Sequence, residues 1–239
     1  MKRAVIVMPA YQAESTIESV FKRIPKNILE KIYSIIVVDD GCTDKTEEII
    51  KKLQEENNKI ILLKHGVNKG YGAAQKTGFN KALGLEADIA ILLHSDGQYP
   101  PEIIEKMISP LENGYDVVLG SRILGGEALK GGMPLIKYIG NRGLTFIENL
   151  AYGLNISEYH SGYMAYSSNA LRTIKFNALS NNFHFDGEMT MMAGKKKLRI
   201  KEVPIPTTYA NEKSHLNIFA YGFDVLSIIF KYLRGGYNL

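Results

Sequence analysis

Short apolar runs that do not alternate with polar residues constrain the fold of this 239-residue chain more than any other feature. They are rich in β-branched residues, as in strands that are buried on both faces of a sheet. The runs are Ala4–Met8, Ser34–Val38, Ile60–Lys64, Ile89–Leu93 and Asp116–Leu119. Amphipathic helical patterns separate them, so strand, helix and strand repeat four times. This order predicts an α/β fold with a mostly parallel central sheet flanked by helices and with right-handed crossovers.

Helix-start signals support this alternation. Ser15 with Glu18 and Asp44 with Glu47 have the spacing of capping boxes, in which a side chain accepts from a backbone N–H of the first turn. Pro100–Pro101 suits a first helical turn, where a missing N–H has no cost. We therefore expect helices to begin at these three places.

Composition narrows the class of protein. With 45% apolar and 23% charged residues, the chain can bury a sizeable core. The formal net charge of +4 is small and dispersed, so we expect no nucleic-acid partner. The one cysteine, Cys42, cannot form an internal disulfide, which fits a reducing, cytoplasmic compartment. The longest apolar stretch near the C-terminus, Ile218–Phe230, contains Asp224 and is too short to span a bilayer.

The residues that follow the first four strands indicate a ligand site, because ligands of such sheets bind beyond the carboxyl ends of the strands. An aspartate there, Asp39 or Asp40, can accept the ring N–H of uracil or guanine, and Tyr11 offers an aromatic face. Asp96 and Gln98 supply hard oxygen ligands that suit Mg²⁺ or Mn²⁺ bridging two phosphates. Each segment alone also fits a simple turn or helix start. Together they predict a site for a nucleoside diphosphate.

Two other nucleotide folds fit poorly. The chain contains no G-x-x-x-x-G-K-[ST] motif, which argues against a P-loop enzyme. Gly70 and Gly72 form half of a dinucleotide-binding fingerprint, but Gln75 stands where a third glycine or alanine belongs. This half-motif also follows the third strand instead of the first.

A series of motifs over roughly residues 4 to 210 resembles the inverting glycosyltransferases of family 2, with the GT-A fold, and within them the dolichol-phosphate (polyprenyl-phosphate) mannosyltransferase-like branch. The order of the motifs is also that of the family. They are VIVMPAYQAE, IIVVDDGCTDKT, NKGYGAAQKTGF, LHSDGQYPPE, GSR at Gly120–Arg122, HSGYMAYS at His160–Ser167, FDGEM and KEVPI.

The resemblance implies a site for a nucleotide-sugar donor and a divalent metal ion, Mn²⁺ or Mg²⁺. Asp96 matches the second aspartate of the family's Asp-x-Asp metal motif, and Gln98 matches a glutamine that assists it. His94 stands in place of the first aspartate; it can ligate Mn²⁺ as a neutral imidazole, or it can simply pack at the strand end. The residues expected to bind the donor are Pro9, Ala10, Tyr11, Glu14, Asp39, Asp40, Lys69, Gly70, Ser95 and Arg142.

The catalytic residues that the resemblance implies depend on the acceptor. A phosphate acceptor is already anionic, so charge stabilisation by Asp96-bound metal and Arg122 is enough. A hydroxyl acceptor needs a base, for which Asp186 and Glu188 are the candidates. Asp186 could instead do no more than cap a helix over Gly187–Gly194.

We expect a glycosyltransferase domain over residues 1–212, with a donor half over about 1–122 and an acceptor half over 123–212, followed by an amphipathic helical tail over 213–239. Pro134–Ile156 reads as an amphipathic helix, packed on the sheet or near the acceptor. Lys213, Ser214 and His215 match a basic loop near the donor phosphates. The enzyme would reach a lipid acceptor peripherally on the cytoplasmic membrane face, with a membrane-anchoring partner subunit, or as a homodimer.

Three functions remain open at this point. The first is sugar transfer from a UDP- or GDP-sugar to polyprenyl or dolichyl phosphate. The second is transfer to a hydroxyl of a glycan or lipid. The third is a nucleotide-sugar binding protein with weakened catalysis, suggested by His94.

Overall fold

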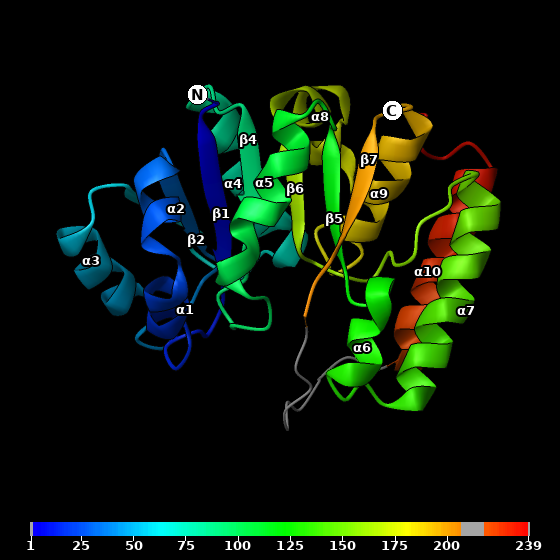
Figure 1. The fold of residues 1–239 in the computed structure, drawn as a ribbon, viewed down its shortest axis with the longest axis horizontal. Helices are drawn as coiled ribbons and strands as arrows, with labels where there is room; N and C mark the ends of the chain where they lie inside the picture. The colour runs from blue at the N-terminus through cyan, green and yellow to red at the C-terminus, as the bar shows by residue number, and fades with distance from the viewer. Residues whose placement is uncertain (1, 207–217, 239) are drawn as a thin grey trace.

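A computed structural model describes residues 2–206 and 218–238 of the chain, without the side chains of residues 218–220. Seven strands form one sheet in the order β3-β2-β1-β4-β6-β5-β7 (Figure 1). The strands are β1 Ala4–Ala10, β2 Ser34–Asp39, β3 Ile60–Lys64, β4 Ile89–Leu92, β5 Val117–Ser121, β6 Met164–Ser167 and β7 Ile200–Pro204. The five predicted strands are therefore confirmed, and the α/β class with them.

One strand departs from the parallel arrangement. β6 pairs antiparallel with β4 on one side and with β5 on the other, while the other pairings in the sheet are parallel. Strands β6 and β7 were not predicted from the sequence. Inserting β6 separates β4 from β5, so these two strands point the same way without sharing hydrogen bonds.

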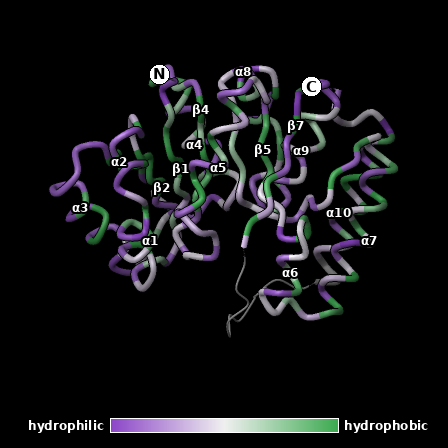
Figure 2. Tube along the Cα trace, viewed as in Figure 1, coloured by the Kyte–Doolittle hydropathy of each residue, from purple (hydrophilic) through white to green (hydrophobic). Residues whose placement is uncertain are grey.

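Helices cover both faces of the sheet. The face formed by Ile6, Ile35 and Ile91 packs against α1, α2, α3 and α5, and the opposite face packs against α4, α8 and α9, while α10 packs mainly against α7. Figure 2 shows β1, β4 and β5 as hydrophobic along their lengths, as strands buried on both faces should be. The helices are α1 Ile17–Arg23, α2 Lys26–Lys31, α3 Thr46–Glu56, α4 Tyr71–Gly84, α5 Ile104–Glu112, α6 Glu127–Lys130, α7 Leu135–Tyr152, α8 Ser168–Thr173, α9 Phe185–Lys195 and α10 Ile218–Leu233, with short 3-10 turns at Pro101–Ile103, Leu124–Gly126 and Phe176–Ala178.

Helices begin near all three predicted places, but the two capping boxes do not form. Pro101 begins a 3-10 turn that leads into α5, as expected. Neither capping box forms, because α1 starts one residue later than the Ser15 box requires, after Thr16, and α3 starts after Lys45. Asp44 instead accepts from the N–H of Thr46, the first residue of α3, and from the Glu14 N–H, in a contact between loops. The side chain thus bonds one N–H at the start of α3 and also joins two loops.

The helix predicted over Pro134–Ile156 is observed as α7, which is shorter at its C-terminal end. Gly153 adopts a left-handed conformation with φ 66°, which ends the helix after Tyr152. α7 and α10 lie side by side at one edge of the molecule (Figure 1). The predicted boundary between domain and tail at residue 212 lies outside the described residues.

Candidate active site

The carboxyl ends of β1, β2 and β4 bring three of the predicted donor segments together. Ala10 of β1 is paired with Asp39 of β2, and the Asp40 N–H donates to Ala10 O at 2.9 Å. Ser95, just after β4, donates through its hydroxyl to Pro9 O at 2.9 Å. The Tyr11 ring is more than half exposed beside them. The strand ends therefore form one edge, as the topology predicts.

The loop after β1 is bonded to the loop after β2. Glu14 accepts from the Lys45 N–H at 2.9 Å, and Gln12 Nε2 donates to the hydroxyl oxygen of Thr43 at 2.9 Å. Gln12 has φ 50°, a conformation that non-glycine residues adopt rarely and that functional loops often contain. These bonds hold the loop that carries the exposed Tyr11 against the loop after β2.

Asp40 is buried and organises the loop that carries Lys69 and Gly70. Its carboxylate accepts from the N–H groups of Lys69 at 2.9 Å and Gly70 at 3.0 Å. Its Oδ1 also lies 2.6 Å from Nδ1 of His65, whose Nε2 lies 2.9 Å from the hydroxyl of Thr77. Gly70, with φ 101°, adopts a backbone conformation that favours glycine. The sequence analysis did not include His65, although it directly follows β3.

Asp39 has a different set of contacts from Asp40. Its Oδ1 accepts from the Cys42 N–H at 2.7 Å, and the side chain is buried. Burial, together with the Asp39 carboxylate, raises the pKa of the Cys42 thiol to about 12. The thiol is therefore protonated at neutral pH.

Asp96 and Gln98 lie exposed on the turn after β4. Asp96 Oδ1 accepts from the Gln98 N–H at 3.0 Å, so the two side chains extend from the same tight turn. Within residues 2–206 and 218–238, no three His, Cys, Asp or Glu side chains group into a metal site. An exposed carboxylate beside an amide carbonyl fits a Mg²⁺ or Mn²⁺ ion that takes its remaining ligands from a bound diphosphate. Lys213, Ser214 and His215, predicted to lie near the donor phosphates, are outside the described residues.

His94 belongs to a hydrogen-bonded network that reaches α4 and α9. Its Nε2 lies 2.8 Å from the Tyr71 hydroxyl and 3.1 Å from Gly162 O. Tyr71 in turn donates to Asp186 Oδ2 at 2.7 Å, and Gln75 donates to Asp186 Oδ1 at 2.8 Å. The sequence analysis included neither Tyr71 nor Gln75 as site residues.

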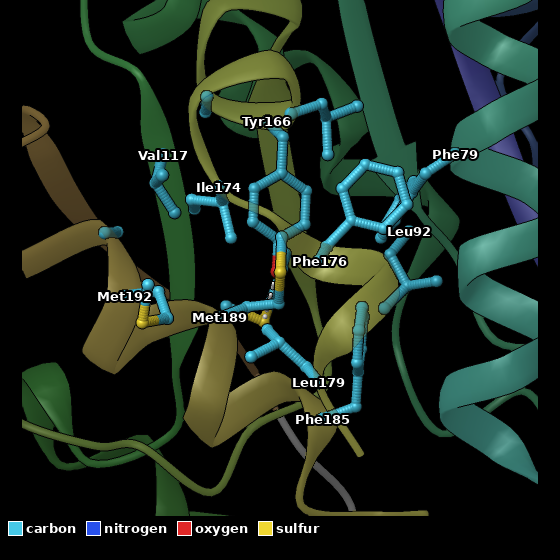
Figure 3. Packing of buried hydrophobic residues seen from close by; sticks show 14 of the residues in the cluster. Phe79, Leu92, Val117, Tyr166, Ile174, Phe176, Leu179, Phe185, Met189 and Met192 are labelled. Atoms are coloured by element: carbon cyan, nitrogen blue, oxygen red, sulfur yellow. Dashed lines mark hydrogen bonds between the residues drawn. The ribbon is translucent and has the colours of Figure 1, made fainter. Parts of the chain in front are cut away.

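Packing of α9 places Asp186 in this network. Phe185, the first residue of α9, stacks near Phe79 of α4 in the buried cluster of Figure 3. Asp186 thus faces Tyr71 and Gln75 on the same helix α4. Burial raises the pKa of the Asp186 carboxyl, and it also raises the pKa of the Tyr71 phenol, with a further contribution from Asp186. Asp186 is not a helix cap, because α9 begins one residue before it.

Glu188 is also buried with both oxygens engaged. Oε2 accepts from the Ser180 N–H at 2.6 Å, and Oε1 accepts from the Tyr237 hydroxyl at 2.5 Å. The two carboxylates considered as bases therefore both serve internal hydrogen bonds.

The two predicted arginines differ in their surroundings. Arg122 is held by Glu158, whose side chain is fully buried: the Arg122 N–H and Nε donate to its two oxygens at 2.7 and 2.9 Å. Arg122 also donates to His160 O at 2.7 Å. Arg142 on α7 is exposed and makes a long contact of 3.4 Å to Ser157 O. The sequence analysis did not include Glu158.

The sequence profile described as Glycosyl transferase family 2 matches residues 5–175, which is more than half of the chain. The chain belongs to glycosyl transferase family 2. It is a glycosyltransferase, and inversion at the transferred sugar is typical of this family.

Relatives of this glycosyltransferase include two archaeal enzymes. The UDP-N-acetylglucosamine–dolichyl-phosphate N-acetylglucosaminyltransferase of Methanococcus voltae is 38% identical over 87% of this chain and 86% of its own length. The dolichol-phosphate mannosyltransferase of Pyrococcus furiosus is 29% identical over 100% of this chain and 64% of its own length. Its relatives thus include members of the dolichol-phosphate mannosyltransferase-like branch that the motifs resemble.

A solved structure confirms the GT-A fold. Glucosyl-3-phosphoglycerate synthase from Mycobacterium tuberculosis, in complex with Mn²⁺, UDP and phosphoglyceric acid, matches with a TM-score of 0.71. The match covers 97% of this chain and 78% of that one, at 17% sequence identity. Because the sequence identity is low, this structural similarity is evidence for the fold alone.

Proposed function

We propose that this glycosyltransferase moves a sugar from a UDP- or GDP-sugar to a polyprenyl or dolichyl phosphate. This choice of acceptor rests on the burial and hydrogen bonding of Asp186 and Glu188. Both are buried, and every carboxylate oxygen of the pair accepts an internal hydrogen bond. A phosphate acceptor needs no base, whereas a hydroxyl acceptor needs one that can reach it. The names of the Methanococcus and Pyrococcus relatives support the same class of acceptor.

The donor would bind along the edge made by the first four strands. Tyr11 supplies an exposed ring for the base, and Asp39 or Asp40 is the proposed partner of the base N–H. Because Asp40 already holds the Lys69 and Gly70 amides, its main contribution would be to shape that loop. The other residues proposed to line the donor site are Pro9, Ala10, Glu14, Lys69, Gly70 and Ser95.

A divalent metal ion would be held by Asp96 and Gln98, with His94 as a third candidate. When bound, it would neutralise charge on the departing diphosphate. The Mn²⁺ and UDP in the structurally similar synthase support this proposal. Arg142 is exposed and therefore suited to meet the acceptor phosphate, while Arg122 is fixed by Glu158 and shapes the same region.

An apolar surface on α7 and α10 supports a position at a membrane. None of the described helices is long and apolar enough to cross a bilayer. The surface is exposed and carries cations beside it, including Arg142 and Arg234, which suits anionic lipid. Its members are Leu135, Ile136, Ile139, Phe146, Ile147 and Leu150 of α7 with Phe223, Leu226, Phe230 and Leu233 of α10. We propose peripheral binding to the cytoplasmic face; a membrane-anchoring partner subunit or a second copy are the other occupants to test.

The test is release of nucleoside diphosphate from a panel of UDP- and GDP-sugars, with Mg²⁺ or Mn²⁺, with and without a short-chain polyprenyl phosphate. Release that requires the lipid phosphate, and that is lost in Asp96→Ala, supports the proposal. Release that is indifferent to the lipid phosphate contradicts it and favours a hydroxyl acceptor. Donor binding without turnover under every condition would instead indicate a binding protein.

A further inference from the structure

His94 occupies the place of a metal-binding aspartate, and the structure surrounds one of its two ring nitrogens with acceptors. We propose that Tyr71, itself held by Asp186 and Gln75, is a positioning residue that fixes His94 as the Nε2–H tautomer and so leaves Nδ1 as the nitrogen able to meet the donor-bound metal ion. The proposal rests on the donor half of the proposed function and is independent of the acceptor.

Gly162 lies against Nε2 of His94. Its carbonyl oxygen lies 3.1 Å from His94 Nε2, and a carbonyl can only accept a hydrogen bond. The Gly162 N–H donates to the Tyr99 hydroxyl at 2.8 Å, which fixes this peptide segment. Nε2 must therefore carry the proton for the contact with Gly162 to be favourable.

Tyr71 has a single hydroxyl proton. That proton is donated to Asp186 Oδ2 at 2.7 Å. The Tyr71 oxygen is then an acceptor toward His94 Nε2 at 2.8 Å. Gln75 Nε2 donates to the second oxygen of Asp186 at 2.8 Å, which fixes the orientation of the carboxylate. Both groups near Nε2 therefore favour the same tautomer.

The imidazole ring of His94 is confined by its neighbours. A Cβ at position 162 would lie 2.7 Å from both Cε1 and Nε2 of His94, so only glycine allows this approach. The Tyr99 ring meets the imidazole edge-on at 4.8 Å between centroids, and Tyr71 does so at 5.3 Å. The imidazole is thus held in orientation as well as in tautomer.

A neutral imidazole ligates through the nitrogen that lacks a proton, and the partner of the other nitrogen sets which one that is. With Nε2–H engaged, Nδ1 keeps its lone pair. Imidazole nitrogen suits Mn²⁺ better than Mg²⁺, which prefers oxygen. We therefore expect the metal–nucleotide complex of this chain to favour Mn²⁺ through His94, and this preference to depend on Tyr71.

The first experiment reads the tautomer directly by ¹⁵N NMR of histidine-labelled protein at about pH 8, above the usual imidazole pKa. The His94 signal is assigned by its disappearance in His94→Gln. Wild type should show Nε2 protonated and Nδ1 unprotonated. In Asp186→Asn the amide can donate to Tyr71, which releases the Tyr71 proton toward Nε2 and should shift the tautomer. An Nδ1–H tautomer in wild type would overturn the proposal.

The second experiment measures binding of Mn²⁺ in the presence of UDP or GDP, by the electron paramagnetic resonance signal of free Mn²⁺. Tyr71→Phe keeps the ring and removes the hydroxyl, and it should weaken Mn²⁺ binding about 10-fold, as loss of an outer-shell partner commonly does. Mg²⁺ binding, followed by competition, should change less. Tyr115→Phe, at the opposite end of the sheet, is the matched control. Equal Mn²⁺ affinity in Tyr71→Phe and wild type would contradict the proposal.

These two readouts separate this inference from the proposed function. Neither uses an acceptor or turnover, so a failure to glycosylate polyprenyl phosphate leaves both results interpretable. Failure of wild type to bind UDP and GDP would refute the donor site, whereas the tautomer would still be measured in the free protein. Because Tyr71→Phe preserves the stack with Phe183, it should fold even where Asp186→Asn does not.

Discussion

The hydroxyl of Tyr237 donates a hydrogen bond to Oε1 of Glu188, at 2.5 Å and 49 positions earlier in the chain. Glu188 belongs to α9, while Tyr237 follows α10 and is buried. The contact joins the last described residues of the chain to the helix that also carries Asp186. A glutamate that looks catalytic in the sequence therefore has a structural partner.

Removing this partner should destabilise the fold. Tyr237→Phe leaves one oxygen of a buried carboxylate without its donor, which costs about 1–3 kcal/mol. Urea unfolding measures the change, and Tyr33→Phe, at an exposed ring, is the control and should change stability little. Equal loss in the two variants would mean that the Tyr237 hydroxyl does not support Glu188.

The two arginines should separate stability from activity. Arg122→Ala leaves the buried Glu158 carboxylate unpaired and should cost about 3–5 kcal/mol. Arg142→Ala, at an exposed side chain, should change stability by less than about 0.5 kcal/mol. It should nevertheless reduce turnover with polyprenyl phosphate. Unchanged turnover in a folded Arg142→Ala would remove Arg142 from the acceptor site.

Stability should depend on pH through Asp186. Burial raises the pKa of this carboxyl in the folded chain, so the folded state binds the proton more tightly than the unfolded state. The resulting stability is fully present below the ordinary pKa of 3.8 and is lost as the pH rises through the raised value. The Asp186→Asn variant has an amide in place of this carboxyl, so it lacks the titrating proton and its contribution to the pH dependence of stability.

The stability of wild type relative to Asp186→Asn should therefore fall as the pH rises from about 3.5 to 7. Urea unfolding of both proteins across this range measures the difference. A constant difference at every pH would show that the carboxyl does not titrate differently in the two states.

Cys42 should be unreactive in the native protein. With a pKa of about 12, raised mainly by burial, its thiolate fraction at pH 8 is about 10⁻⁴, against roughly 0.2 for an ordinary thiol. Alkylation by iodoacetamide, followed by mass spectrometry, should be about 10³-fold slower in the folded protein than in urea. Similar rates in both conditions would contradict the raised pKa of the Cys42 thiol.

The apolar surface of α7 and α10 should determine membrane binding. Ile136→Ser with Phe146→Ser removes two strongly exposed apolar side chains and should reduce sedimentation with anionic vesicles several-fold. Val67→Ser, an exposed apolar residue on the loop after β3, is the control. If wild type does not bind vesicles but elutes as a dimer that the double variant disrupts, the surface is an interface between copies.

Several features of the fold were predictable because they depend on neighbours in sequence. Buried strands such as Ser34–Asp39 are recognisable from continuous β-branched residues, and the turn from Asp96 to Gln98 forms within three residues. The edge where ligands bind follows from parallel strands and needs no side-chain contacts. The order of motifs along the chain likewise indicated the family without any coordinates.

Other features depended on segments that meet only in the folded chain. The antiparallel insertion of β6 is one, because pairing of a short strand depends on which edge is available to it. The partners of the site residues are another: Tyr71 meets Asp186 across 115 positions. Helix α9 could have offered its carboxylates to solvent with the same local sequence.

The sequence by itself therefore determined the layered α/β class, the ligand-binding edge and the residue types available there, since these arise from local periodicity and strand direction. Only the tertiary structure decided that Asp186 and Glu188 are buried and bonded, and that Nε2 of His94 lies against Tyr71 and Gly162. The physical reason is that burial and hydrogen-bond partners are set by the packing of α9 against α4 and by the contact of Tyr237, after α10, with α9, which no local pattern encodes.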